Sequence, residues 1–136
     1  MSRVVKAVMV ALLVASSGLL GVSAANAQPP QPACGYTLSP PQVVNAGGVS
    51  KVTATVSFYA CGAPFRPAMS VACVHLAGHD SQGQCTQARG PAPAQVFFEP
   101  YQPGATYIAS GRGCGKVFED ALEPNCDMLG PINATL

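Results

Sequence analysis

Six cysteines spread over the chain from residue 34 to residue 126 constrain its fold more than any other feature. They are Cys34, Cys61, Cys73, Cys85, Cys114 and Cys126. In a small domain outside the cytoplasm, an even number of cysteines indicates a disulfide framework, because the compartment is oxidising and the core alone is marginal. If the chain is exported, the six cysteines predict three disulfides.

The amino-terminal segment indicates export. Residues 1–27 begin with two basic side chains, continue through an apolar stretch from Ala7 to Leu20, and end in Ala25-Asn26-Ala27. This is the pattern of a secretory signal peptide, whereas a membrane anchor needs about 20 uninterrupted apolar residues. We expect cleavage after Ala27, no stable membrane span after cleavage, and a mature protein that is secreted or held in the cell-envelope space.

Removal of the signal peptide leaves a short lead and one domain. Residues 28–33 are glutamine and proline with one alanine, a composition that favours an extended segment without a core. Residues 34–136 are too few for two full domains. We expect them to form a single disulfide-stabilised β domain.

The charge of the mature chain is close to neutral. The full sequence has seven basic and six acidic residues, and Arg3 and Lys6 leave with the signal peptide, so the remainder carries a formal charge of −1. Nucleic-acid binders and polybasic membrane-surface proteins carry a basic excess. The composition therefore disfavours both classes, predicts no nucleic-acid partner, and favours recognition by shape and apolar contact.

The spacing of the cysteines favours one set of disulfides among fifteen. Two pairs flank turn-rich segments and leave a third pair: Cys73 with Cys85, Cys114 with Cys126, and Cys34 with Cys61. A bond between Cys61 and Cys73 would close an equally short loop, so that pairing stays an alternative.

Alternation of side chains predicts strands. The clearest case runs from Val52 to Ala60, where apolar residues occupy every second position: Val52, Ala54, Val56, Phe58 and Ala60. A period of two is typical of a half-buried strand. Shorter candidates are residues 36–38, 42–44, 95–98 and 106–110, and the apolar run 69–76 fits a central strand buried on both sides.

Seven or so short strands at regular spacing predict an all-β fold, a small antiparallel sandwich. The only helix candidate is Gly115–Leu122, before Pro124, and this segment fits a strand followed by a loop equally well. We interpret the run Gly111–Gly115 as a bulged turn around a disulfide.

The segment Pro103–Tyr107, followed by Cys114, resembles the region in which immunoglobulin-like sandwiches place a tyrosine near the start of a late strand. The leader and the composition rich in alanine, glycine and proline resemble small exported actinobacterial proteins of the mycobacterial type. The short disulfide loops are similar to those of apoproteins of the neocarzinostatin type. These resemblances imply an immunoglobulin-like sandwich, and they assign no ligand and no site residue.

One stretch offers metal ligands. His75, His79 and Asp80 lie between Cys73 and Cys85, and together they could hold zinc or copper. Two histidines four residues apart converge best on a helix, whereas this stretch is a predicted hairpin between oxidised cysteines. The favoured interpretation is therefore one strand histidine and one solvated turn histidine, and we expect no cofactor.

Catalytic motifs are absent from the sequence. There is no Gly-x-Ser-x-Gly elbow, no phosphate-binding loop and no Cys-x-x-Cys pair, so no catalytic residue is assigned. The acidic residues between 119 and 127 lack the spacing of a calcium loop and fit a solvated face better.

Four aromatic residues surround a proline-glycine turn and could form a binding rim: Phe97, Phe98, Tyr101 and Tyr107. Exposed, they would suit a protein, a glycan or an apolar ligand. The favoured interpretation is core packing of Phe97 and Tyr107, with Tyr101 covering the turn, because a small sandwich needs large side chains to fill its centre.

The leading functional hypothesis is a secreted, non-enzymatic binding or interaction module whose partner is an extracellular protein, a glycan or an apolar ligand. One alternative is an exported metal-binding protein that uses His75, His79 and Asp80. Another is a small secreted hydrolase whose site carries no recognisable motif.

Overall fold

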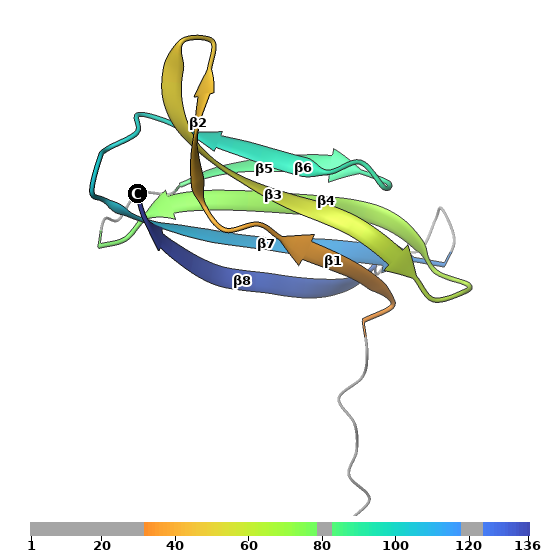
Figure 1. The fold of residues 1–136 in the computed structure, drawn as a ribbon. Helices are drawn as coiled ribbons and strands as arrows, with labels where there is room; N and C mark the ends of the chain where they lie inside the picture. The colour runs from red at the N-terminus through yellow and green to blue at the C-terminus, as the bar shows by residue number, and fades with distance from the viewer. Residues whose placement is uncertain (1–31, 79–82, 118–123) are drawn as a thin grey trace, which may run out of the picture.

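The computed structural model describes residues 32–78, 83–117 and 124–136. These residues form eight strands in two antiparallel sheets that face each other, as Figure 1 shows, and no helix occurs among them. The predicted all-β fold and antiparallel sandwich are confirmed. The predicted signal peptide and most of the lead lie outside the described residues.

The first sheet is built around one long strand, β3. It contains β1 (Cys34–Leu38), β2 (Gln42–Ala46), β3 (Val49–Cys61) and β6 (Ala94–Phe98). β2 pairs with the first part of β3 and β1 with the last part, whereas β6 pairs with the middle. The hairpin of β2 and β3 projects beyond the sandwich (Figure 1).

The second sheet has the strand order β5-β4-β7-β8. Its members are β4 (Arg66–Leu76), β5 (Gln84–Arg89), β7 (Thr106–Lys116) and β8 (Asn125–Thr135). Each neighbouring pair is antiparallel. The chain crosses from the first sheet to the second between β3 and β4, returns to the first sheet for β6, and ends in the second.

The strands that sequence alternation predicted are all present, but two others and half of a third were missed. β5 is mostly exposed and polar, and Gly130-Pro131 interrupts the side-chain pattern of β8. Neither segment therefore shows an alternation of apolar and polar residues. The predicted turn at Gly111–Gly115 is wrong, because β7 continues to Lys116. The described start of the helix candidate therefore belongs to β7, and its residues 118–122 lie outside the described part.

The core fills the space between the sheets with alternate side chains from both. Its buried members are Cys34, Tyr36, Val52, Ala54, Val56, Ala72, Val74, Leu76, Ala94, Val96, Phe98, Tyr107 and Ala109. β4 is central in its sheet, as expected, but only one of its faces is fully buried. The prediction that Ala60 shares the buried face of Val56 is wrong, because a register shift between the two residues leaves Ala60 exposed.

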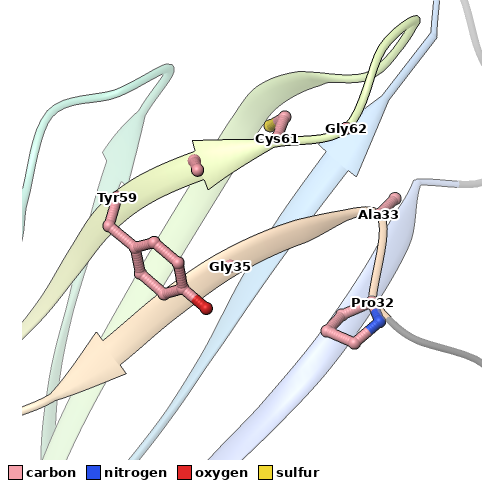
Figure 2. Close-up of a pocket in the computed structure, with 7 residues that line it drawn as sticks. Pro32, Ala33, Gly35, Tyr59, Cys61 and Gly62 are labelled. Atoms are coloured by element: carbon pink, nitrogen blue, oxygen red, sulfur yellow. The ribbon is translucent and has the colours of Figure 1, made fainter.

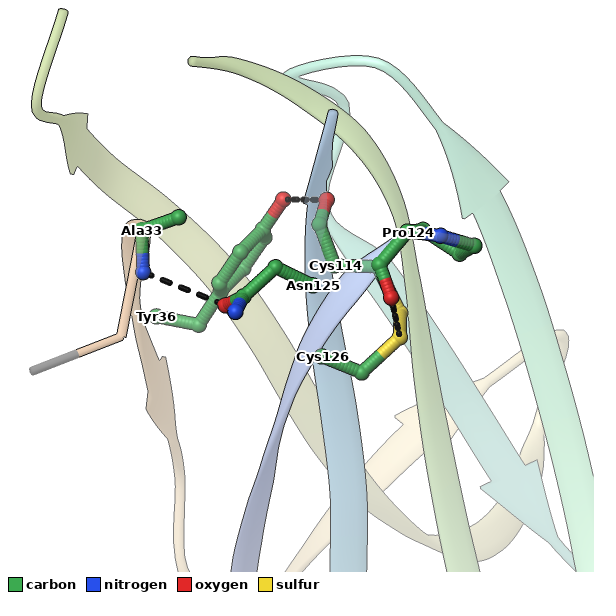
Figure 3. Close-up of a disulfide and its surroundings, with 6 residues drawn as sticks. All are labelled: Ala33, Tyr36, Cys114, Pro124, Asn125 and Cys126. Atoms are coloured by element: carbon green, nitrogen blue, oxygen red, sulfur yellow. Dashed lines mark hydrogen bonds between the residues drawn. A yellow bond between two sulfur atoms is a disulfide. The ribbon is translucent and has the colours of Figure 1, made fainter. Parts of the chain in front are cut away.

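A stripe of glycines on β7 lets the two sheets approach closely. A Cβ atom at Gly111, Gly113 or Gly115 would meet a side chain of the first sheet: Val56, Tyr36 and Cys34, respectively. The Tyr36 ring lies against Gly113, and its hydroxyl donates a hydrogen bond of 2.8 Å to the carbonyl oxygen of Cys114 (Figure 3). The glycine-rich run is therefore a packing surface within a strand.

All three disulfides join residues that lie directly opposite each other on neighbouring strands. The pairs are Cys34–Cys61, Cys73–Cys85 and Cys114–Cys126. These are the pairs that the cysteine spacing favoured, and the alternative between Cys61 and Cys73 is excluded. Each bond lies within one sheet, so the two sheets are held together by packing and hydrogen bonds.

Candidate functional site

The structure divides the four aromatic residues of the predicted rim between the core and the surface. Phe98 and Tyr107 pack edge to face in the core, with ring centroids 5.7 Å apart. Tyr101 stacks over Tyr107 at 6.4 Å. Only Phe97 points outward, from the opposite side of β6, so the four rings do not make one exposed surface.

Tyr107 also fixes the turn that precedes it. The backbone N–H of Gln102 donates a hydrogen bond of 2.7 Å to the Tyr107 hydroxyl oxygen. A buried tyrosine needs such a partner for its polar end. Tyr107, Tyr101 and Phe98 therefore hold the β6–β7 connection to the sandwich.

The candidate metal ligands are only partly described. His75 lies on β4 opposite Ile108, half-buried on the outer face of the second sheet. His79 and Asp80 fall outside the described residues. Within residues 32–78, 83–117 and 124–136, no three histidine, cysteine, aspartate or glutamate side chains gather into a metal site.

A β-bulge creates a hollow on the outer face of the first sheet. Gly35 pairs with Ala60 and Tyr36 pairs with Phe58, so Tyr59 is the extra residue on β3. A bulge of this kind turns two successive side chains toward the same side of the sheet. Tyr59 and Ala60 are both exposed there, opposite a glycine that has no side chain.

The Tyr59 ring lies over Gly35 and forms one wall of this hollow (Figure 2). The hollow has a volume of about 380 Å³ and is lined by Pro32, Ala33, Gly35, Tyr59, Ala60, Cys61 and Gly62. A hydrogen bond of 3.0 Å from the Gly62 N–H to the Ala33 carbonyl oxygen closes the strand pair at one end. We name this site the Tyr59 hollow.

The chemistry of the Tyr59 hollow is uncharged. Among its lining residues the phenol of Tyr59 is the only ionisable group, because Cys61 is bonded to Cys34. Tyr59 is 69% exposed, so its hydroxyl and the ring face that is turned away from Gly35 are available to a ligand. The lining thus offers an aromatic face, small apolar groups and backbone polar atoms.

The sequence contained half of the signal for this site. The alternation of apolar residues from Val52 to Phe58 predicts that Tyr59 lies on the opposite face of the strand, and it does lie there. The bulge depends on how β1 aligns with β3, and that alignment cannot be seen in either strand alone.

Comparisons with models of protein families, with characterised proteins and with solved structures found no match to this chain. The part of the chain that the structure describes contains no helix that is long and apolar enough to cross a membrane. The three disulfides are of a kind that persists in oxidising environments.

Proposed function

We propose that the protein is a secreted, non-enzymatic binding module that holds a segment of neutral glycan in the Tyr59 hollow. The observation that carries the proposal is the exposed Tyr59 ring, which lies over Gly35 and forms one wall of a concave hollow whose lining has no charged group. A sugar ring has apolar C–H faces and polar hydroxyl edges. It therefore matches a site that offers an aromatic face together with backbone donors and acceptors.

The size and openness of the hollow favour a glycan over the other partners expected from the sequence. Its volume of about 380 Å³ lies at the small end of the range for ligand pockets, which runs from about 300 to 1,000 Å³. A wholly apolar ligand gains most from an enclosed site, and the Tyr59 ring is largely exposed. A polar ligand with one apolar face loses little by staying partly in water.

A binding role also agrees with the groups that line the hollow. Nucleophilic or acid–base catalysis needs a nucleophile or a pair of titratable groups within hydrogen-bond distance. The lining supplies one phenol, a disulfide sulfur and backbone. Such a set can position a ligand, which is the function proposed.

Two features support secretion and an immunoglobulin-like scaffold as parts of the same proposal. The first is the signal-peptide pattern of residues 1–27 together with the three disulfides. The second is the strand order, in which β3 and β6 share one sheet while β4, β7 and β8 share the other. In an immunoglobulin domain, the second and fifth strands likewise lie in one sheet, and the third, sixth and seventh strands lie in the other.

A glycan array with matched variants tests the proposal. The wild-type protein is expected to bind at least one neutral glycan, and Tyr59→Ala should weaken that binding at least about tenfold, because aromatic anchors carry much of the energy of small sites. Tyr59→Phe keeps the ring and removes the hydroxyl, so it should retain most of the affinity.

The control is Phe97→Ala, which removes an exposed ring from the same sheet outside the hollow. This variant should bind as the wild type does. Equal losses in Phe97→Ala and Tyr59→Ala, or no binding of any neutral glycan by the wild type, would contradict the proposal.

A further inference from the structure

The outer face of the second sheet collects most of the positive charge of the domain. Its register places Arg66 opposite Lys116, Arg89 opposite Met69, and Arg112 between Val71 and Met128. Directly opposite residues of an antiparallel pair point to the same side of the sheet. We name the surface made by Arg66, Arg89, Arg112 and Lys116 the cationic face.

The glycine stripe fixes the direction of these side chains. The missing Cβ atoms of Gly113 and Gly115 point toward Tyr36 and Cys34 in the core. Because side chains alternate along a strand, Arg112 and Lys116 point away from the core. Met128, which is opposite Arg112 and 74% exposed, also lies on this outer side.

No described acidic residue shares the cationic face. Asp127 is opposite Gly113 and therefore belongs to the inner side, and Glu99 pairs with Lys51 on the first sheet at 3.2 Å. Arg66, Arg89 and Arg112 are exposed and form no ion pair with a described residue. The acidic residues 119, 120 and 123 lie outside the described part of the chain.

The cations are spread over a plane. Arg89 and Arg112 are on strands two positions apart, or about 10 Å across the sheet. Arg66 is opposite Lys116, four residues beyond Arg112 on β7, and therefore lies about 13 Å from Arg112 along the sheet. The three arginines form a triangle with sides near these lengths, which contacts a flat charged surface with every member at once, whereas a single linear polymer would follow only one of its sides.

We propose that the cationic face docks the protein on an anionic lipid surface. Cations within a Debye length of such a surface are attracted to it, and arginine binds phosphate oxygens through two parallel hydrogen bonds. The exposed Met128 side chain beside Arg112 can enter the headgroup layer. The Tyr59 hollow lies on the outer side of the opposite sheet, so a docked protein presents it away from the lipid.

This proposal differs from the expectation drawn from composition, which disfavoured a polybasic membrane-surface protein. Net charge is a sum over the whole chain, so a chain of nearly zero net charge can still carry most of its basic residues on one face. The interaction holds the protein at the lipid surface without a membrane-spanning segment, and it is independent of the glycan proposal.

The test measures co-sedimentation of the mature protein, without the expected signal peptide, with lipid vesicles. We expect binding to vesicles of phosphatidylcholine mixed with phosphatidylglycerol, weaker binding as salt is raised, and no binding to phosphatidylcholine alone. Arg89→Gln and Arg112→Gln should each lower the partition coefficient about fivefold, because each cation near an anionic lipid surface contributes about 1 kcal/mol to the binding free energy. The double variant should lose about 25-fold.

Lys51→Gln is the matched control, because it removes the same charge from the other sheet. Its partition coefficient should stay within about twofold of the wild type, since Lys51 belongs to the first sheet and faces away from the lipid. Circular dichroism confirms that each variant is folded. The proposal is overturned by equal binding to both kinds of vesicle or by an equal loss in Lys51→Gln. Binding to a soluble acidic polysaccharide with none to vesicles also overturns it.

Discussion

The outer faces of the two sheets differ in charge and in covalent support. On the first sheet, threonine and serine alternate along β3, the one lysine is paired with Glu99, and the bulge at Tyr59 leaves a hollow. On the second sheet, four cations lie on the same outer side as two disulfides. One near-neutral chain thus makes one outer surface without net charge and one that is cationic, because the alternation of side chains along each strand places the basic residues on one side of the molecule.

The strongest test of this contrast compares the disulfides of the two sheets. Replacing Cys34 and Cys61 with alanine should lower the free energy of unfolding by about 4 kcal/mol. The change removes a bond between residues that are 27 positions apart in the sequence, and it leaves a void at buried Cys34. Replacing Cys73 and Cys85, which are 12 residues apart on the outer face, should cost about 3 kcal/mol. Denaturant unfolding without reductant measures both.

A larger loss from the Cys73–Cys85 pair would contradict this ranking. It would mean that the second sheet depends on its surface disulfide more than the first depends on the bond that reaches the core. Alanine is the replacement of choice because serine would leave a buried hydroxyl at position 34 and confuse the comparison.

Two glycine substitutions compare the core with the hollow. Gly113→Ala places a methyl group against the Tyr36 ring, which is buried and cannot move, so it should lower the free energy of unfolding by about 2–3 kcal/mol. Gly35→Ala meets the Tyr59 ring, which is exposed and free to swing away. It should cost less than about 1 kcal/mol while disturbing the hollow.

Thermal unfolding and glycan binding separate the two outcomes. The expected pattern is a lowered melting temperature in Gly113→Ala and a near-normal melting temperature with weakened binding in Gly35→Ala. If Gly35→Ala unfolds the protein as easily as Gly113→Ala does, the Tyr59 ring is a structural support and the hollow is not a separate site.

Alkaline unfolding gives the smallest expected effect. Burial raises the pKa of the Tyr36 phenol, so the folded protein keeps the neutral form at a pH where the unfolded chain ionises. The associated stability is complete below about pH 10, the ordinary tyrosine value, and is lost as pH rises through the folded value. Tyr36→Phe should remove this loss.

At neutral pH, Tyr36→Phe should cost about 1 kcal/mol, because it deletes the hydrogen bond to the Cys114 carbonyl oxygen. Unfolding free energies measured from neutral to strongly alkaline pH provide the check. Parallel curves for the wild type and the variant would show that the buried phenol does not set the alkaline limit.

The sequence predicted the features that depend on one segment. Alternation from Val52 to Phe58 assigned a strand and its buried face, and the two short cysteine loops indicated disulfides at chain reversals. It missed β5 and β8, whose segments lack alternation and gain their strand conformation by pairing with β4 and β7.

The candidate sites depend on the register between segments, and for that reason the sequence did not predict them. The Tyr59 hollow requires the shift between β1 and β3. The cationic face brings Arg89 of β5 and Arg112 of β7 to one side through their shared neighbour β4. The aromatic rim does not assemble for a different reason, because neighbouring Phe97 and Phe98 point to opposite sides of one strand, β6.

The placement of each disulfide between directly opposite residues bears on the order in which the protein folds and oxidises. Cys73–Cys85 and Cys114–Cys126 join strands that follow each other along the chain. Each bond needs only one hairpin to form, and a hairpin forms in microseconds. Oxidation of these two pairs therefore does not have to wait for the sandwich to close, and each half of the second sheet can be crosslinked as soon as its two strands have paired.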